Sequence, residues 1–160
     1  MNRGKPKVRL SGGKKGFTLI EILVVIGIIA VLAGMVLVAV NPARQFKLAR
    51  DSERTSDVQS ILNAVGQNIS EHKGSFYCMG VQKDLPTTFT DIKSGGSAGD
   101  IGPCLVPDYL SSLPFDPAIA NKNFISTTSY DTGYQIARDI NGRVTASSTG
   151  ELVATISATR

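Results

Sequence analysis

The sequence is poor in the side chains that carry most enzyme chemistry. Its 160 residues include one histidine, two cysteines and no tryptophan. Cys78 and Cys104 do not have the spacing of a zinc site or a redox motif, and the sequence contains no phosphate loop or dinucleotide motif. At 17.0 kDa the chain is also too small for a large enzyme. We therefore do not expect an enzyme.

Hydrophobicity and positive charge are both concentrated near the N-terminus. Between residues 17 and 40, 20 of 24 positions are apolar, and the rest of the chain has the composition of one small polar domain, which excludes a polytopic membrane protein. Six basic residues precede this run without any acidic residue, and the remainder holds 11 basic and 13 acidic residues. The net charge of +4 therefore reflects a basic N-terminal arm and gives no evidence for direct nucleic-acid binding.

The apolar run has the length of a membrane-spanning helix. Its 24 residues would extend about 36 Å as a helix, more than the hydrocarbon core of about 30 Å. A secretory signal peptide would have a shorter apolar region and a small-residue cleavage site, and no convincing site occurs near Asn41. Because six basic residues precede the run and four follow it, we expect a single-pass protein with a cytoplasmic N-terminus.

Helical periodicity continues beyond the apolar run. Pro42 interrupts the pattern, and an apolar stripe is then clearest from Val58 to Ile69. We predict one long helix from about Phe17 to about Glu71, roughly 80 Å long and kinked near Pro42. A small domain cannot bury so long a helix, so its first half requires either lipid or other copies of the chain.

The segment between residues 44 and 57 is strongly charged. Three pairs of opposite charge have helical spacing: Lys47 with Asp51, Arg50 with Glu53, and Arg54 with Asp57. Such pairs stabilise an exposed helix by a few tenths of a kcal/mol each. They predict a solvated helix surface here.

The C-terminal half predicts a small β-sheet head. Prolines punctuate a loop-rich stretch from residue 86 to 117. Strand patterns at 133–140 and 143–147 flank Asn141-Gly142, a strong hairpin signal, and a third strand pattern is centred on Ala154. We predict an α+β protein in which a three-stranded antiparallel meander packs on the apolar stripe of the helix.

Cys78 and Cys104 lie in the part expected to be exported, where a pair of cysteines favours a disulfide. Closing a loop of about 27 residues would stabilise the fold by roughly 3–4 kcal/mol in the chain-entropy model. The alternative is two reduced, buried thiols.

Glu21 is the only charged residue in the apolar run. A carboxylate in a bilayer is costly, so this position requires an explanation. One interpretation is a capping box, because Thr18 and Glu21 match the Ser/Thr-x-x-Glu pattern before an apolar stretch. The other is a counter-charge for an amine buried between subunits.

The residues around Glu21 form a recognisable motif. Lys15-Gly16-Phe17-Thr18-Leu19-Ile20-Glu21, followed by the apolar run, closely resembles the N-terminal signature of type IV pilins and pseudopilins. The match extends from residue 14 to about 62. Cys78 and Cys104 are similar only in kind to pilin disulfides, which usually lie nearer the C-terminus.

The resemblance implies specific roles for these residues. A prepilin peptidase would cleave between Gly16 and Phe17 on the cytoplasmic face, and the new terminus at Phe17 would be N-methylated. Cleavage would remove the six basic residues, and Glu21 would pair with the Phe17 amine of a neighbouring subunit. Thr18 and Pro42 would complete the segment used in assembly.

The resemblance also implies a division of the chain. Residues 1–16 would be a leader peptide, 17–40 the transmembrane and filament-core half of the helix, and 41–72 its amphipathic half. Residues 73–160 would form the head.

A second motif of the family occurs in the head. Leu113-Pro114-Phe115-Asp116-Pro117 resembles the Leu-Pro-x-Asp-Pro element of many pilins and pseudopilins, although a proline-bounded turn in which Asp116 bonds nearby backbone also explains it. In major pseudopilins of type II secretion this region precedes a calcium-binding loop. Here no tryptophan follows, and the carboxylates are not clustered, so Asp116 and Asp131 are weak calcium candidates. No other cofactor is expected.

Residues 95–99 formally match the G-x-S-x-G motif of serine hydrolases, with Ser97 as the serine. That motif requires a strand, a helix and a histidine base. The only histidine, His72, falls at the end of the predicted helix, so we expect no hydrolase.

Three functions remain open. The first is a structural subunit of a type IV pilus-like filament, whose partners would be copies of itself, the prepilin peptidase, the membrane before assembly and an assembly platform. The second is a major pseudopilin of a type II secretion system. The third, of another class, is a membrane-anchored, exported binding module.

Overall fold

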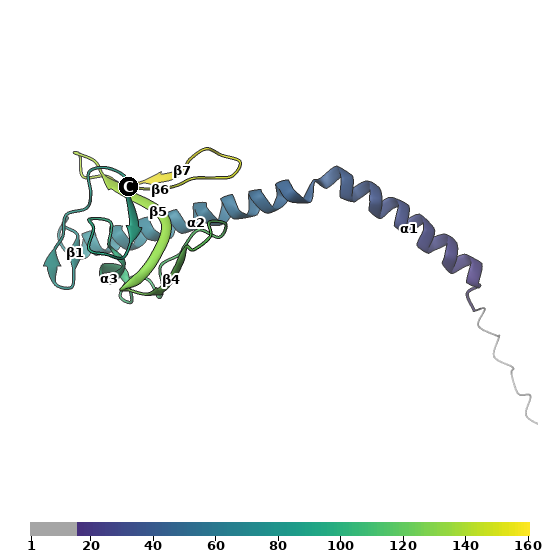
Figure 1. Cartoon of the computed structure of the whole chain (residues 1–160), viewed down its shortest axis with the longest axis horizontal. Helices are drawn as coiled ribbons and strands as arrows, with labels where there is room; N and C mark the ends of the chain where they lie inside the picture. Colours follow the sequence, from purple (N-terminus) through teal and green to yellow (C-terminus); the bar gives the residue numbers. More distant parts are fainter. Residues whose placement is uncertain (1–15) are drawn as a thin grey trace, which may run out of the picture. The chain divides into compact units, whose positions relative to one another are not determined.

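The computed structural model describes residues 16–160, so most of the predicted leader lies outside the described residues. The chain divides into two compact units, one ending at Pro42 and the other running from Ala43 to Arg160. Helix α1 belongs to the first unit (Figure 1). The second contains nearly all of helix α2 together with the β-sheet head. The predicted α+β class, with a long N-terminal helical region and a small antiparallel sheet, is confirmed.

Helix α1 covers Leu19–Val40, and none of its 22 residues is buried. Thr18 caps its N-terminus from an extended conformation. In the described part of the chain, α1 is the one helix long and apolar enough to cross a membrane. The apolar run therefore forms the continuous helix that its composition predicts.

The predicted single helix is wrong at Asn41. This residue adopts a left-handed conformation, with φ 45° and ψ 80°, and ends α1. Helix α2 then begins at Pro42 and extends to Glu71. Asparagine tolerates a left-handed conformation better than most residues, and proline suits a first helical position because the N–H it lacks would have no helical partner there. Pro42 therefore starts a second helix and does not kink a continuous one.

Helix α2 buries one face against the head. Its buried residues follow a spacing of three and four: Asp51, Arg54, Val58, Ile61, Leu62, Ala64, Val65 and Asn68. Val58, Ile61 and Val65 join Tyr134, Ile136 and Ala146 of the sheet in a single hydrophobic core. The predicted packing of the sheet on the Val58–Ile69 stripe is confirmed.

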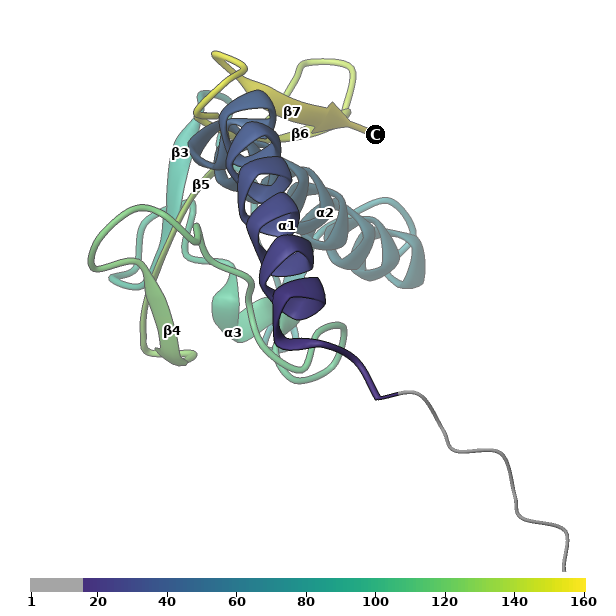
Figure 2. The same cartoon turned by 90° about the vertical axis from the view of Figure 1, so that its right-hand side faces the viewer.

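The sheet is antiparallel and has five strands. β3 (Thr90–Lys93), β5 (Ser129–Arg138), β6 (Val144–Ser148) and β7 (Ile156–Thr159) pair in that order, and β4 (Asn123–Ser126) also pairs with β5. The sheet lies along one side of α2 (Figures 1 and 2). The predicted meander corresponds to β5, β6 and β7. Strand β3 lies in the stretch predicted to be loop-rich, and β4 lies after it, where no strand was predicted.

Two predicted strand boundaries are wrong, one for a local reason and one because of a distant residue. The β5–β6 turn contains Asn141-Gly142 as predicted, but it spans five residues because the Asp139 carboxylate accepts hydrogen bonds from the amides of Asn141 and Arg143. The third strand begins at Ile156 instead of near Leu152. The amide of Leu152 donates to a carboxylate on α2 and is not available to a neighbouring strand.

A small subdomain lies beside the C-terminal end of α2. It contains the short hairpin of β1 (Tyr77–Cys78) and β2 (Val81–Gln82) and the single-turn helix α3 (Gly102–Leu105). Leu105 and Phe76 extend the hydrophobic core into this region.

Candidate functional site

The N-terminal motif forms the start of α1. The Thr18 hydroxyl accepts a hydrogen bond from the Glu21 amide at 3.2 Å, and the Glu21 carboxylate accepts one from the Thr18 amide at 3.5 Å. This is the predicted capping box. Both side chains and the neighbouring Phe17 are exposed. Capping leaves the Glu21 carboxylate at the surface, so it does not exclude an additional role in pairing with an amine.

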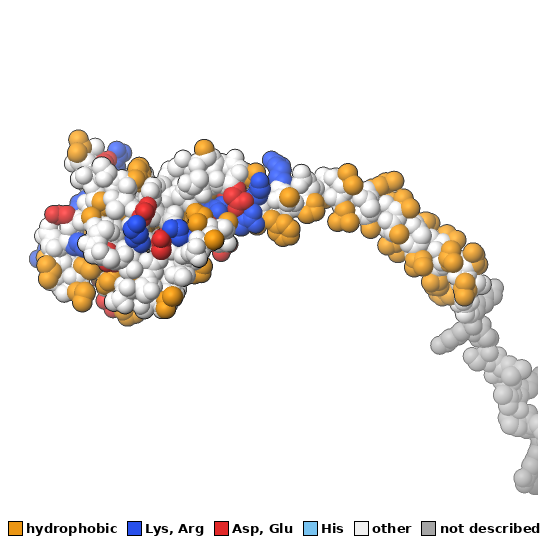
Figure 3. Space-filling view, in the orientation of Figure 1, with side chains coloured by type: hydrophobic (Ala, Val, Ile, Leu, Met, Phe, Trp, Pro, Cys, Tyr) orange, Lys and Arg blue, Asp and Glu red, His pale blue; other side chains and the backbone are white. Residues whose placement is uncertain are grey.

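The α1 surface is uniformly apolar beyond this first turn. Hydrophobic side chains cover the visible face of α1 (Figure 3). The exposed side chains beyond the first turn are valine, leucine, isoleucine, methionine and alanine, and Glu21 is the one charged residue of the helix. Each large apolar side chain left in water forgoes roughly 1.5–3 kcal/mol relative to full burial. A helix of this composition therefore requires an apolar environment that its own unit does not supply.

A second constellation joins α2 to the head, and we call it the Arg54 cluster: Arg50, Asp51, Arg54, Asp116 and Glu151. Arg54 is only 2% exposed. Its guanidinium donates two hydrogen bonds to the Asp116 carboxylate, at 2.7 and 3.0 Å, and one to Asp51 at 2.7 Å. A bidentate arginine–carboxylate pair of this kind fixes orientation as well as charge. It attaches the Leu113–Pro117 segment to the middle of α2.

Asp116 also bonds its own turn. Its Oδ1 accepts hydrogen bonds from the amides of Ala118 and Ile119, at 2.8 and 3.1 Å. The interpretation of the Leu113–Pro117 motif as a turn in which Asp116 bonds nearby backbone is therefore confirmed.

The rest of the cluster holds the β6–β7 loop. The Asp51 carboxylate accepts hydrogen bonds from the amides of Glu151 and Leu152 at 2.8 and 2.9 Å. Arg50 pairs with the Glu151 carboxylate at 2.5 and 2.6 Å. Two loops that are about 35 residues apart in sequence are thus fastened to adjacent turns of one helix.

The cluster keeps its carboxylates ionised. The amides of Glu151 and Leu152, with a smaller contribution from Arg54, lower the pKa of Asp51 to about 2. Burial alone would raise the pKa of Asp116, but Arg54 and the two turn amides outweigh it and lower that pKa. Hydrogen bonding to Arg50 lowers the pKa of Glu151. Each acid is therefore charged at neutral pH and can balance a guanidinium.

The three predicted ion pairs on the helix surface are wrong. Arg54 turns toward Asp51 and the head, and Asp57 instead accepts a hydrogen bond from the Tyr134 hydroxyl at 2.6 Å. Arg50 pairs across to the β6–β7 loop and not with Glu53. Arg54 lies four residues before Val58, and Asp51 lies three residues before Arg54. Extending the apolar stripe toward the N-terminus with this helical spacing would therefore have identified the buried face.

Comparison with known proteins assigns the N-terminal segment. Residues 12–37 match the family described as Prokaryotic N-terminal methylation motif. The chain carries the prepilin signature of type IV pilins and pseudopilins. No curated protein and no solved structure matches it. The motif supports a pilin-like or pseudopilin-like subunit, which is a structural protein anchored in a bacterial membrane, and it does not distinguish a pilus from a secretion system.

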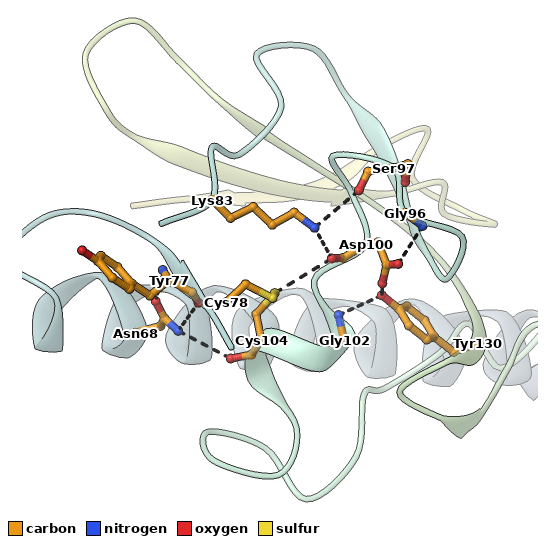
Figure 4. The surroundings of a disulfide bond; sticks show 10 residues. All are labelled: Asn68, Tyr77, Cys78, Lys83, Gly96, Ser97, Asp100, Gly102, Cys104 and Tyr130. Atoms are coloured by element: carbon orange, nitrogen blue, oxygen red, sulfur yellow. Dashed lines mark hydrogen bonds between the residues drawn. A yellow bond between two sulfur atoms is a disulfide. The ribbon is translucent and has the colours of Figure 1, made fainter. Parts of the chain in front are cut away.

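The head of this pilin-like subunit contains the predicted disulfide between Cys78 and Cys104. It joins β1 to α3 next to Asn68 of α2 (Figure 4). Asn68 is 2% exposed; its side chain donates to the Tyr77 carbonyl at 2.9 Å and accepts from the Tyr77 amide at 2.8 Å. The covalent link and the amide together fix the β1–β2 hairpin to the helix.

Each of the two calcium candidates of the subunit is bonded to a cation of the chain. Asp116 belongs to the Arg54 cluster, and Asp131 accepts a hydrogen bond from Lys122 at 2.8 Å. Among residues 16–160, no group of three or more histidine, cysteine or acidic side chains could hold a metal ion.

The G-x-S-x-G segment lies between β3 and α3. The amide of Gly96 donates to the Asp100 carboxylate at 2.8 Å (Figure 4), and the amide of Gly95 donates to it at 3.2 Å. The Ser97 hydroxyl oxygen is buried and has no hydrogen-bond partner within residues 16–160. His72 stacks on Tyr77 and contacts the Asn68 carbonyl. The segment thus closes on the Asp100 carboxylate, and the contacts of His72 are with Tyr77 and Asn68.

Proposed function

We propose that this chain is a structural subunit of a type IV pilus-like filament, cleaved by a prepilin peptidase between Gly16 and Phe17 and N-methylated at Phe17. The subunit is held in the cell membrane by α1, with its N-terminus in the cytoplasm and its head exported. It then polymerises with its own copies through α1, with the help of an assembly platform. The observation that carries the proposal is a fully exposed apolar helix whose single carboxylate lies in a prepilin motif.

The proposal gives the exposed helix two successive environments. Lipid covers α1 before assembly, and the α1 helices of neighbouring subunits cover it afterwards. Cleavage creates an ammonium group at Phe17 that must enter the apolar filament core. A buried charge without a partner is destabilising by about 3–5 kcal/mol, and Glu21 of a neighbour supplies the opposite charge.

The head favours a pilus over a major secretion pseudopilus. The family resemblance implies a calcium-binding loop for major pseudopilins, and in this head the two acidic residues that are weak calcium candidates are bonded to cations of the chain. Asp116 is engaged by Arg54 and Asp131 by Lys122. In this head the side chains of Arg54 and Lys122 therefore balance the charges of these two carboxylates, and this is the observation that supports the pilus.

Three variants separate the charge of Glu21 from its capping role. Glu21→Gln keeps an acceptor for the Thr18 amide but removes the charge, Glu21→Ala removes both, and Thr18→Ala removes the hydroxyl half of the cap but keeps the charge. We expect both Glu21 variants to be cleaved, membrane-held and nearly free of filaments, while Thr18→Ala assembles. Filament counts by electron microscopy and mass spectrometry of the subunit N-terminus provide the measurements. Normal filament yield from Glu21→Gln would refute the pairing role.

A further inference from the structure

The two ends of α2 carry charges that its dipole disfavours. A helix has a partial positive charge at its N-terminus and a partial negative charge at its C-terminus. The first turn of α2 has no acidic residue and contains Arg44, and the last turn has no basic residue and contains Glu71. Lys47 adds a further positive charge one turn later. Side chains and dipole therefore have the same sign in the first and in the last turn of α2, and we call these two ends of the helix electropositive and electronegative.

The electropositive end presents a short amphipathic segment, Phe46-Lys47-Leu48. Phe46 is 65% exposed and Leu48 39% exposed. Lys47 is exposed and takes part in none of the ion pairs within residues 16–160. Lys and Arg side chains gather over this half of α2 (Figure 3). Lys47 is therefore flanked in sequence by two apolar residues whose side chains the head leaves largely or partly uncovered.

The electronegative end contains a hollow of about 350 Å³. It opens beside the C-terminal turn of α2 and the β1–β2 hairpin. Its charged, aromatic and thioether wall includes Glu71, Tyr77, Met79, Asp108 and Tyr109. Two of these are carboxylates, and the lining, which falls wholly within the described residues, includes no lysine or arginine. Lys73 follows the helix nearby but does not line the hollow. The wall thus combines negative charge with an aromatic and thioether surface.

Contacts within the wall keep it charged and ordered. The Tyr109 hydroxyl donates to the Glu71 carboxylate at 2.7 Å, which lowers the pKa of Glu71 and raises that of Tyr109 to about 12. His72 and Tyr77 stack with their ring centroids 4.4 Å apart. Met79, 84% exposed, stands at the rim. A preordered aromatic and acidic hollow suits a side chain with an apolar body and a cationic head.

The hollow and the Phe46–Leu48 segment cannot meet within one chain. Lys47 and Glu71 are 24 residues apart on a continuous helix, a separation of about 36 Å. A contact between them therefore joins two copies. Because the two surfaces differ, the contact is heterologous and joins copies head to tail, which is the type of contact that an open filament requires.

We propose that the hollow beside Glu71 and Asp108 binds the Phe46–Leu48 segment of a second copy, with the Lys47 ammonium group against the two carboxylates. This inference rests on the proposed function, because the contact would occur inside the filament. It identifies a head-to-tail contact between second units, in addition to the burial of α1. Subunits joined in this way would follow one another at about 36 Å along α2, the length that separates the two surfaces.

Zero-length carbodiimide cross-linking of wild-type filaments tests the contact directly. This reagent joins an amine to a carboxylate only when the two are in contact. We expect Lys47 to become linked to Asp108 or Glu71, and any such link must be intermolecular because of the distance along α2. Mass spectrometry of the cross-linked peptides provides the measurement. Links from Lys47 to other carboxylates alone would overturn the inference.

Charge reversal provides the second test. Lys47→Glu and Asp108→Lys should each lower filament yield about tenfold or more, because like charges then face each other, and the double variant should recover most of it. Lys93→Glu makes the same charge change on β3, outside both surfaces, and should assemble normally. Wild-type yield from Lys47→Glu, or no recovery in the double variant, would contradict the contact.

The two proposals fail in different ways. If wild-type cells make no filaments of subunits that begin at Phe17, the proposed function is wrong. If they make filaments that are indifferent to the charge of Lys47 and show no cross-link from it to the hollow, only the head-to-tail contact is wrong.

Discussion

Helices α1 and α2 are neighbours in sequence, but α1 buries none of its apolar side chains and α2 buries charged ones. All 22 residues of α1 are exposed although nearly all are apolar, whereas α2 buries an arginine and an aspartate within a charged sequence. The apolar side chains of α1 have no partners in their own unit, so other molecules must supply them. The buried charges of α2 are tolerated because every one has an opposite charge or an amide within hydrogen-bond distance. Local hydrophobicity alone therefore does not decide which residues a head covers.

The same comparison separates anchoring from folding. Changes in α1 should affect membrane retention and assembly while leaving the head intact. Changes in the buried face of α2 should destabilise the head while leaving α1 able to insert. The following predictions test this separation, from the largest expected effect to the smallest.

Removal of the central cation should have the largest effect. Arg54→Met leaves Asp116 and Asp51 without their cation, and we expect the free energy of unfolding of the second unit to fall by about 3–5 kcal/mol. Arg143→Met, which breaks an exposed pair with Asp139, should cost at most about 1 kcal/mol. Urea unfolding of the full chain in detergent, followed by tyrosine fluorescence, measures both. Equal losses would show that the Arg54 cluster does not stabilise the fold through buried charge.

Loss of the disulfide should have a slightly smaller effect. Replacing Cys78 and Cys104 together with alanine should lower the free energy of unfolding by about 3–4 kcal/mol, from the entropy of a loop with a sequence separation of 26 residues. The effect should be confined to the head, with the fraction of chain in the membrane unchanged. Fractionation and urea unfolding of the same preparation provide the comparison. A fall in membrane retention would contradict the separation of the two units.

A charge in the middle of α1 should impair membrane insertion and leave the stability of the head unchanged. Val31→Arg should raise the free energy of membrane insertion by about 2.5–3.5 kcal/mol, while Leu19→Arg, at the end of the helix, should raise it much less. Neither should change the urea midpoint of the head. Measurement of the membrane-inserted fraction tests the first expectation, and a head destabilised by Val31→Arg would oppose the second.

Lowering the pH should have the smallest effect on the free energy of unfolding. The carboxylates concerned belong to the Arg54 cluster, and the hydrogen bonds that they accept from amides partly survive protonation. The folded-state pKa of Asp51, about 2, lies below its ordinary value of 3.8, and the pKa values of Asp116 and Glu151 are also lowered. Their stabilisation is therefore complete above pH 4–5 and is lost as the pH falls toward 2. Urea midpoints between pH 5 and pH 2.5 should decline, and Asp51→Asn should reduce that decline. A midpoint that rises on acidification would contradict this sign.

Several features of the fold could be predicted because they depend on neighbouring residues. The apolar run, its capping box at Thr18 and Glu21, and the prepilin motif are all contained in a few consecutive turns. The β5–β6 hairpin was found because Asn141-Gly142 is a local turn signal. The disulfide followed from the pair of cysteines in a segment expected to be exported.

Other features could not be predicted because their partners are distant in sequence. Arg54 continues the helical spacing of the buried stripe, but its neighbours in sequence do not reveal the partner that neutralises it, which is Asp116, 62 residues away. Strand β4 is short and gains its order from pairing with β5, so its own composition gives a weak signal. The start of β7 is set by an aspartate on α2.

The sequence by itself determined that this chain has an apolar N-terminal helix with one carboxylate, a prepilin motif and a small polar head. These properties follow from composition and spacing, which act over one or two helical turns. Only the tertiary structure decided which charges are buried, because burial depends on where distant loops return to α2. The tertiary structure also decided that the acidic hollow and the Phe46–Leu48 segment lie at opposite ends of α2, because a continuous helix holds its two ends at a fixed distance.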